Sequence, residues 1–165
     1  MQTSLLVFFD EGMVNFLKQD IEDVWGFLKA VYGTAAIVVG LDKFTFLLAD
    51  WTGYVSPLVL SVVPLPASAI VNIVGIVEIA AGIIIFSQWT KIGSYIVSAW
   101  ITVVALNLVM NGAYDIAVRD LIIAAGAFVL AKFTIIKEKA VQEEVHHSMH
   151  HSELMKMKPS LKSVV

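Results

Sequence analysis

A chain of 165 residues that is 58% hydrophobic, with a mean hydropathy of +0.82, is too apolar to be an ordinary soluble domain of this size. The absence of cysteine excludes disulfides, thiol catalysis, iron–sulfur clusters and c-type haem attachment. The net charge of −3 indicates no class of partner, and nothing in the composition points to nucleic acid. The composition therefore predicts a small integral membrane protein.

The first 23 residues differ from the rest of the chain in their periodicity. Apolar Val14, Leu17, Ile21 and Val24 alternate with charged residues at the spacing of an amphipathic helix. Residues 1–23 are therefore predicted to form a helix lying at the membrane interface, with the groove of a soluble partner as the alternative. A cleaved signal peptide is not expected, because this segment has no basic n-region.

The length of the chain limits how often it crosses the bilayer. Hydrocarbon about 30 Å thick needs roughly 20 apolar residues per helical crossing, so there is room for about four crossings in one domain. The predicted fold is an all-α, integral membrane four-helix bundle over residues 24–136. The crossings are expected at about residues 24–48, 67–87, 92–110 and 116–136.

The connection after the first crossing is long and contains several residues that disfavour a continuous helix. Trp51 and Tyr54 suit the membrane interface. Pro57, Pro64 and Pro66 interrupt helical structure. This segment is therefore predicted to be an interfacial or re-entrant connection.

The distribution of lysines predicts the orientation in the membrane. Lys91 lies in the second connection and further lysines lie in the tail, residues 137–165, whereas the first and third connections have none. Because basic residues favour the cytoplasmic side, both termini are predicted to be cytoplasmic. The expected location is the inner (cytoplasmic) membrane, with four spans and a polar cytoplasmic tail at 137–165.

Glycines recur seven residues apart in two of the predicted spans. Gly33 and Gly40 share one helix face, and Gly75 and Gly82 share another. Small residues allow helix backbones to approach closely in lipid. This pattern predicts tight packing of the first and second spans.

Polar side chains interrupt the predicted spans, and the predicted topology places all of them in the outer half of the membrane. An unpaired charge near the bilayer centre costs about 3 kcal/mol on insertion scales, so these groups are expected to pair or to line a wet cavity. Two cations accompany four carboxylates, so one carboxyl group is expected to be protonated or to face external water; Glu78 is the deepest. The candidate ligand-binding set is Asp42, Lys43, Glu78, Asn107, Asp115, Arg119 and Asp120, accompanied by Asn72 and Asn111.

Several pairings are available to these groups. Asp115 and Arg119 are spaced i, i+4 and can bridge along one helix face. Lys43 and Arg119 can each neutralise Glu78 or Asp42 across the bundle. Three interpretations stay open: an ionic network that fixes helix register, a pocket with apolar walls for a polar headgroup, and snorkelling of the two cations to the outer surface.

Three stretches resemble the DoxX-like family of small four-helix integral membrane proteins. The stretch LKAVYGTAAIVVGLDKF is similar to the family's first helix, with a basic residue, two glycines and a lysine in the family's order. IVGIVEIAAGIIIF and YDIAVRDLIIAAGAFVLA resemble its second and fourth helices. The matching positions are Lys29, Gly33, Gly40 and Lys43, then Glu78 and Gly82, then Asp115, Arg119 and Asp120.

The resemblance, over residues 28–133, implies a membrane subunit or companion of a quinone-linked redox system. The first hypothesis is an accessory or structural subunit, more a non-catalytic component than an enzyme, of a larger membrane electron-transfer complex. Its partners would be the lipid bilayer and other membrane subunits of the redox complex. No intrinsic cofactor is expected, and a quinone or a lipid is the candidate bound molecule.

Two other functions stay open. One is a quinone- or quinol-binding oxidoreductase subunit that uses the outer-half polar pocket. There Glu78 would exchange a proton and Lys43 or Arg119 would hold a quinone oxygen. The other is a small-solute transporter or an assembly factor.

The tail contains the chain's four histidines. His146 with His150, and His147 with His151, are spaced i, i+4, so a helix would present two imidazoles on one face to zinc, copper or nickel. A solvated or partner-bound tail is the favoured interpretation, and metal binding is the weak alternative. Since no histidine lies in the predicted spans, bis-histidine haem ligation inside the bundle is excluded.

Overall fold

The computed structural model describes the backbone of residues 2–162, which form helices and the turns between them. Side chains are described for residues 16, 18–143, 145–150, 152 and 153. The all-α prediction is confirmed for this part of the chain. The elements are α1 (Gln2–Thr45), the short 3-10 helix η1 (Trp51–Tyr54), α2 (Pro57–Val62), α3 (Ala67–Phe86), α4 (Thr90–Met110) and α5 (Tyr114–Lys162).

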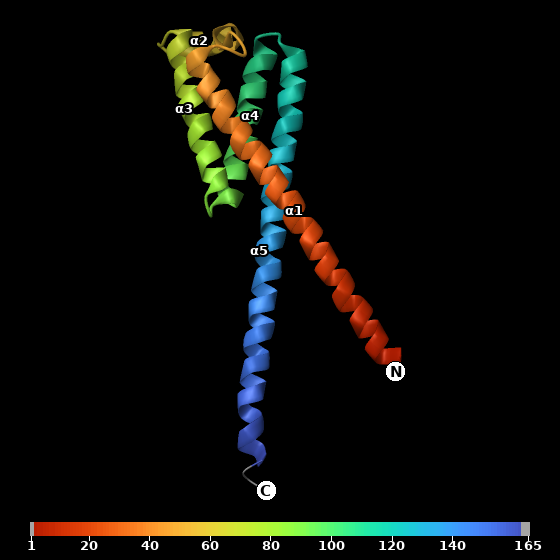
Figure 1. Cartoon of the computed structure of the whole chain (residues 1–165). Helices are drawn as coiled ribbons and strands as arrows, with labels where there is room; N and C mark the ends of the chain where they lie inside the picture. Colours follow the sequence, from red (N-terminus) through yellow and green to blue (C-terminus); the bar gives the residue numbers. More distant parts are fainter. Residues whose placement is uncertain (1, 163–165) are drawn as a thin grey trace.

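The long helices associate as two pairs. α1 packs along α3, α4 packs along α5, and contacts between α3 and α4 join the pairs. Figure 1 shows η1 and α2 lying across one end of the molecule, near the turn between α4 and α5. We call this the loop end, and we call the opposite end, at the α3–α4 turn of residues 87–89, the tail end. Both α1 and α5 extend beyond the tail end (Figure 1).

Among the residues that the structure describes, three helical segments are long and apolar enough to cross a membrane. They are Lys18–Thr45, Ala67–Phe86 and Thr90–Met110. The fourth predicted crossing, residues 116–136, lies in α5 and contains three charged residues, Arg119, Asp120 and Lys132. The fold is therefore that of a helical protein with three candidate membrane spans, and a crossing by α5 stays a prediction.

α1 does not break at the boundary predicted between residues 23 and 24. It is one helix of 44 residues, about 66 Å long at 1.5 Å per residue. No proline interrupts this part of the sequence, and the first half of α1 projects from the bundle (Figure 1). The amphipathic pattern predicted for residues 1–23 depends partly on Val14 and Leu17, whose side chains lie outside those described.

The predicted tail, residues 137–165, begins inside a helix. α5 is continuous for 49 residues to Lys162, which is about 74 Å of helix. Its first part packs along α4 and its second part leaves the bundle at the tail end (Figure 1). The tail is thus a helical extension of the last bundle helix.

Glycines allow α1 and α3 to approach at backbone distance. A Cβ atom added to Gly40 would lie 2.8 Å from the carbonyl oxygen of Gly75, and one added to Gly75 would lie 2.7 Å from the carbonyl oxygen of Gly40. Towards the tail end, a Cβ added to Gly82 would lie 2.8 Å from the carbonyl oxygen of Gly33. The close packing predicted from the two glycine pairs is confirmed.

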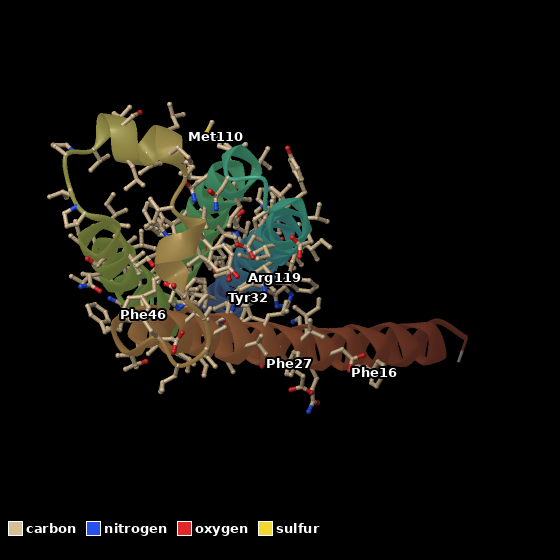
Figure 2. All side chains as sticks on the ribbon, turned by 90° about the horizontal axis from the view of Figure 1, so that it is seen from above. Phe16, Phe27, Tyr32, Phe46, Met110 and Arg119 are labelled. Atoms are coloured by element: carbon tan, nitrogen blue, oxygen red, sulfur yellow. The ribbon has the colours of Figure 1, made fainter. Side chains whose placement is uncertain are left out.

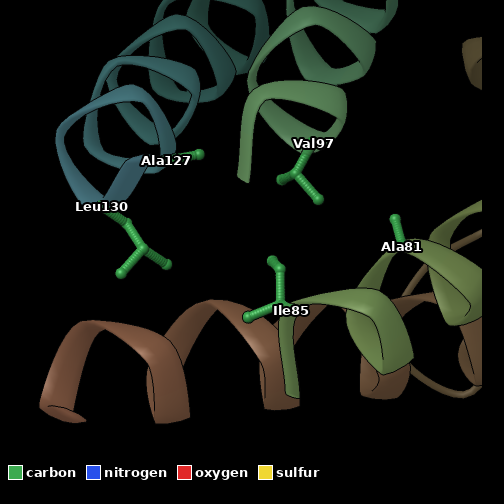
Figure 3. Close-up of a cluster of buried hydrophobic side chains, with 5 residues drawn as sticks. All are labelled: Ala81, Ile85, Val97, Ala127 and Leu130. Carbon is green, nitrogen blue, oxygen red and sulfur yellow. The ribbon is translucent and has the colours of Figure 1, made fainter. Parts of the chain in front are cut away.

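Small and medium side chains fill the interior, and large apolar side chains cover the outside. The buried cluster joins α3, α4 and α5 (Figure 3) and contains Ala81, Ile85, Val97, Ala127 and Leu130. Figure 2 shows side chains radiating outward from the helices, and many large apolar ones are more than half exposed, such as Ile76, Ile83 and Ile122. This distribution fits a lipid environment, in which burying large apolar groups brings little gain.

The glycine contact gives a direct stability test. Gly40→Ala is expected to destabilise the fold by about 1–3 kcal/mol, because the added methyl group meets the backbone of α3. Gly26, in the same helix, has no atom within 4 Å of an added Cβ. Gly26→Ala is therefore expected to be neutral or to stabilise by up to about 1 kcal/mol. Unfolding in mixed micelles, followed by circular dichroism, measures both, and equal effects would contradict the close packing.

Candidate functional site

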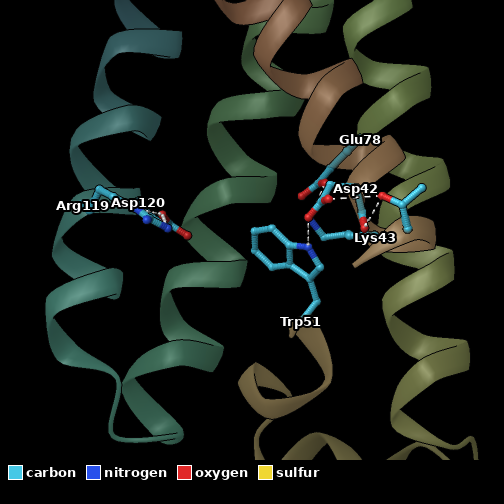
Figure 4. Close-up of polar contacts among 7 residues, drawn as sticks. Asp42, Lys43, Trp51, Glu78, Arg119 and Asp120 are labelled. Atoms are coloured by element: carbon cyan, nitrogen blue, oxygen red, sulfur yellow. Dashed lines mark hydrogen bonds and ion pairs between the residues drawn. The ribbon is translucent and has the colours of Figure 1, made fainter. Parts of the chain in front are cut away.

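A buried ion pair connects α1 to α3 near the loop end. The ammonium nitrogen of Lys43 donates a hydrogen bond to Oε2 of Glu78 at 2.5 Å, and the two side chains are only 7% and 15% exposed. Close helix packing makes this contact possible: a Cβ atom on Gly75, one turn before Glu78, would lie 3.0 Å from Cβ of Lys43. Of the pairings predicted for Lys43, the structure contains the one with Glu78 (Figure 4).

Trp51, in η1, lies against both the ion pair and the last turn of α1. The ammonium nitrogen of Lys43 lies 4.1 Å from the centroid of the Trp51 ring, a cation–π contact that stabilises a partly desolvated cation. The indole nitrogen of the same ring donates to Oδ2 of Asp42 at 2.7 Å. Trp51 therefore contacts both charged residues at once, one through the face of its ring and one through its edge (Figure 4).

Asp42 holds the chain where it leaves α1. The residue is 5% exposed. Phe46, just past the last helical residue, has a left-handed backbone with φ of 55° and turns the chain away from the helix axis. The carboxylate accepts hydrogen bonds from four donors: the backbone N–H groups of Leu47 and Leu48, the Thr45 hydroxyl and the Trp51 indole. Asp42 is thus fully engaged in closing the helix.

Two asparagines at the end of α4, Asn107 in its last turn and Asn111 just after it, hold the connection between α1 and α3. The side-chain oxygen of Asn107 accepts from the backbone N–H of Ser56 at 3.0 Å, and its amide nitrogen donates to the carbonyl oxygen of Tyr54 at 2.7 Å. The amide nitrogen of Asn111 donates to the carbonyl oxygen of Gly53 at 2.8 Å. Ser56 is completely buried and its hydroxyl caps α2. These asparagines therefore attach η1 and α2 to the bundle.

The bridge that Asp115 and Arg119 could form along α5 is not present among the described side chains. The Arg119 guanidinium donates instead to Oδ1 of the adjacent Asp120, from Nε at 3.2 Å and Nη2 at 3.1 Å. The Arg119 side chain is 60% exposed, because residue 119 lies on the outer surface of α5. Asp115 is exposed in the first turn of α5, where the helix dipole favours a carboxylate.

The structure thus gathers only part of the predicted set. Asp42, Lys43 and Glu78 form one cluster around Trp51. Figure 4 shows Arg119 and Asp120 on a separate side of the site. The arrangement matches the register-fixing network best, because the buried groups satisfy one another. Snorkelling fits Arg119, but not the buried Lys43.

Sequence reasoning missed the position of Trp51. Its placement beside the prolines indicated an interfacial anchor, yet the ring is only partly exposed and binds the ion-pair region. The sequence did contain a signal for this contact. An aspartate followed directly by a lysine within a membrane span needs a neighbouring group that can both donate a hydrogen bond to the carboxylate and stabilise the cation. An indole meets that need, since it combines an N–H donor with an electron-rich face.

The histidine segment forms part of the projecting end of α5. His146, His147 and His150 are exposed on this helix, whereas the side chain of His151 lies outside those described. Among the described residues, no group of three or more His, Cys, Asp or Glu is placed to hold a metal ion. The predicted i, i+4 pair of His146 and His150 is thus present on one helix without further ligands from the described side chains.

Comparisons of the chain with known protein families, with characterised proteins and with solved structures find no match. Fold and site together define a class: a small helical protein with three candidate membrane spans and a buried ion pair between two of them. The DoxX-like resemblance rests on the matching residues and stays a prediction.

The ion pair can be tested with a double replacement. Lys43→Met is expected to destabilise the protein by about 3–5 kcal/mol, because Glu78 then loses its partner in a poorly solvated site. Replacing both residues with methionine should cost less than this single change, because no charge is left unpaired. Unfolding in mixed micelles measures all variants, and a double variant less stable than Lys43→Met would contradict the pairing.

The helix-closing role of Asp42 gives a second test. Asp42→Asn places an amide N–H₂ among four donors, so we expect a loss of about 1–3 kcal/mol. Asp50→Asn is the matched control, because Asp50 caps η1 at an exposed position where asparagine serves nearly as well. Micelle unfolding gives the stability. Equal losses in the two variants would show that Asp42 does not hold the end of α1.

Proposed function

We propose that this chain is a non-catalytic accessory subunit of a larger, quinone-linked electron-transfer complex in the cytoplasmic membrane. It crosses the membrane four times, with both termini in the cytoplasm. The observation that carries the proposal is the projection of α1 and α5 far beyond the bundle (Figure 1). The redox part of the proposal comes from the resemblance of the three sequence stretches.

The fourth crossing is supported by the packing of α5. The part of α5 that packs along α4 has to share the depth of that candidate span. Its charges suit this position, since Arg119 is exposed near the loop end and Lys132 is exposed near the tail end. Long basic side chains at such positions reach the membrane surface with their charged ends.

The orientation is supported by lysines at the tail end. Lys29, Lys91 and Lys137 lie near the α3–α4 turn or the projecting part of α5. The only basic residues near the loop end are Lys43, which is buried, and Arg119, within the part of the chain whose side chains are described. A tail end facing the cytoplasm agrees with the preference of basic residues for that side.

A structural role is supported by the state of the buried polar groups. Lys43 and Glu78 bond to each other, and Asp42 accepts four hydrogen bonds within its own chain. A quinone oxygen would have to displace Glu78 from Lys43 before it could bind there. The geometry therefore favours a scaffold over a quinone-binding oxidoreductase subunit.

A larger complex is supported by the projecting helices. A single helix without packing partners is marginally stable in water. On the projecting part of α5, Val141, Val145 and Met149 follow one another at four-residue spacing and are each about half exposed. Such an apolar row is suited to contact with another subunit.

Purification from native membranes tests this function. The tagged full-length chain, extracted in mild detergent, is expected to bring down membrane redox subunits, and its deletion should lower quinone-linked electron flux. The double variant Val141→Ser/Val145→Ser should lose these partners by at least several-fold. Ile76→Ser, on the lipid-exposed face of α3, is the matched control and should retain them.

Two results would contradict the proposal. One is a stable, solitary monomer whose deletion leaves electron flux unchanged. The other is binding of a quinone analogue to the isolated chain that is lost in Lys43→Met and Glu78→Gln, which would favour the oxidoreductase alternative.

A further inference from the structure

A second polar region lies at the tail end, where three helices meet. α3 has 20 residues, and at about 1.5 Å per residue it is as long as the hydrocarbon layer is thick. Ser87, which follows α3, must then lie at the membrane surface. The ammonium nitrogen of Lys29 donates to the Ser87 carbonyl oxygen at 3.1 Å, so this part of α1 lies at the same level.

An indole ring organises two cations at this level. The ammonium nitrogen of Lys29 lies 4.9 Å from the centroid of the Trp25 ring, and that of Lys137, from α5, lies 4.0 Å from it. The ring is fixed in place because its N–H donates to the hydroxyl of Thr134 at 2.9 Å. Thr134 is itself buried and donates to the Leu130 carbonyl oxygen. Two lysines from different helices are thereby held beside one ring.

The ion pairs between described side chains in this region leave one of its three lysines without a carboxylate. Glu22 pairs with Lys137 at 3.3 Å, and Glu138 pairs with Lys91 at 2.7 Å. Among the described side chains, Lys29 has no carboxylate partner and is close enough to Lys137 for their like charges to interact. A site that places two ammonium groups beside one ring, with Glu22 paired to only one of them, favours an additional anion.

We propose that Lys29 and Lys137 bind the phosphate group of an anionic phospholipid at the tail end of the bundle. A phosphate offers several acceptor oxygens, and the Ser87 carbonyl uses only one of the three N–H donors of Lys29. Basic sites between membrane helices recognise anionic headgroups in this way. The site lies opposite the predicted outer-half pocket and uses none of its residues.

The surroundings favour a lipid over free phosphate. Phe86, at the end of α3, lies against Gly33, one turn from Lys29 on α1, and Ile136 is beside Lys137 on α5; both side chains are nearly half exposed. Trp89, in the α3–α4 turn, is 61% exposed, as expected of a ring at the membrane surface. Acyl chains leaving a phosphate at this level would therefore run along apolar side chains. Free phosphate would leave that surface uncovered.

Lipid retention by the intact chain tests the site. The full-length protein is incubated in detergent with equal amounts of phosphatidylglycerol and phosphatidylcholine, and bound lipid is measured by native mass spectrometry. We expect at least a five-fold preference for phosphatidylglycerol. Lys29→Gln/Lys137→Gln should reduce this preference to near equality. Lys29→Arg/Lys137→Arg should keep it, because arginine also donates to phosphate. Lys139→Gln, on the exposed side of α5, is the matched control and should leave it unchanged.

Three outcomes would overturn the proposal. They are equal retention of the two lipids by the unaltered chain, an unchanged preference in the double glutamine variant, and complete displacement of phosphatidylglycerol by millimolar inorganic phosphate. Circular dichroism confirms that each variant is folded, and the arginine pair keeps the test valid if the glutamine pair does not fold. The experiment uses the isolated chain, so its result is independent of whether redox subunits co-purify.

Discussion

The backbone contact between α1 and α3 determines most of what the loop end contains. Because Gly40 and Gly75 lack side chains, the two helices approach closely enough for Lys43 to reach Glu78. The resulting buried cation attracts the face of Trp51, whose edge then bonds to Asp42 at the end of α1. Packing in lipid relies on such close contacts, since helices gain little there from hydrophobic burial.

The charged side chains at the two ends of the bundle differ in how completely they are paired within the chain. At the loop end, Asp42 and Lys43 are each matched by groups from the same chain, so this end is closed. At the tail end, Trp25 holds Lys29 and Lys137 together without a full set of anions. The arrangement at the loop end fixes the register of the helices. The arrangement at the tail end leaves lysine ammonium groups that an anionic lipid of the surrounding membrane can bind.

The sequence predicts those features that depend on local pattern. Hydropathy and length locate the ends of α3 and α4 within two residues, and the glycine spacing predicts the close contact of α1 with α3. The predicted location of Lys43 and Glu78 at a similar depth in the membrane was also enough to suggest that they pair. The direction of a side chain around a helix axis is harder to predict from sequence, and the partners suggested for Arg119 (Asp115, Glu78 and Asp42) did not include Asp120, to which it bonds. The contacts of Trp51 depend on how the whole connection between α1 and α3 folds. The sequence of that connection has no helical or strand periodicity from which its fold could be predicted.

The continuity of α1 has a mechanical consequence. A helix of 44 residues without a proline transmits rotation along its length, so its projecting half cannot turn about its axis independently of the half that carries Lys43. A turn of one residue position, about 100°, would carry Lys43 away from Glu78 and leave both charges unpaired. Any subunit that binds the projecting half of α1 is therefore held at a defined angle relative to α3. Rotation of that half about the helix axis is opposed by the Lys43–Glu78 salt bridge at the opposite end of the molecule.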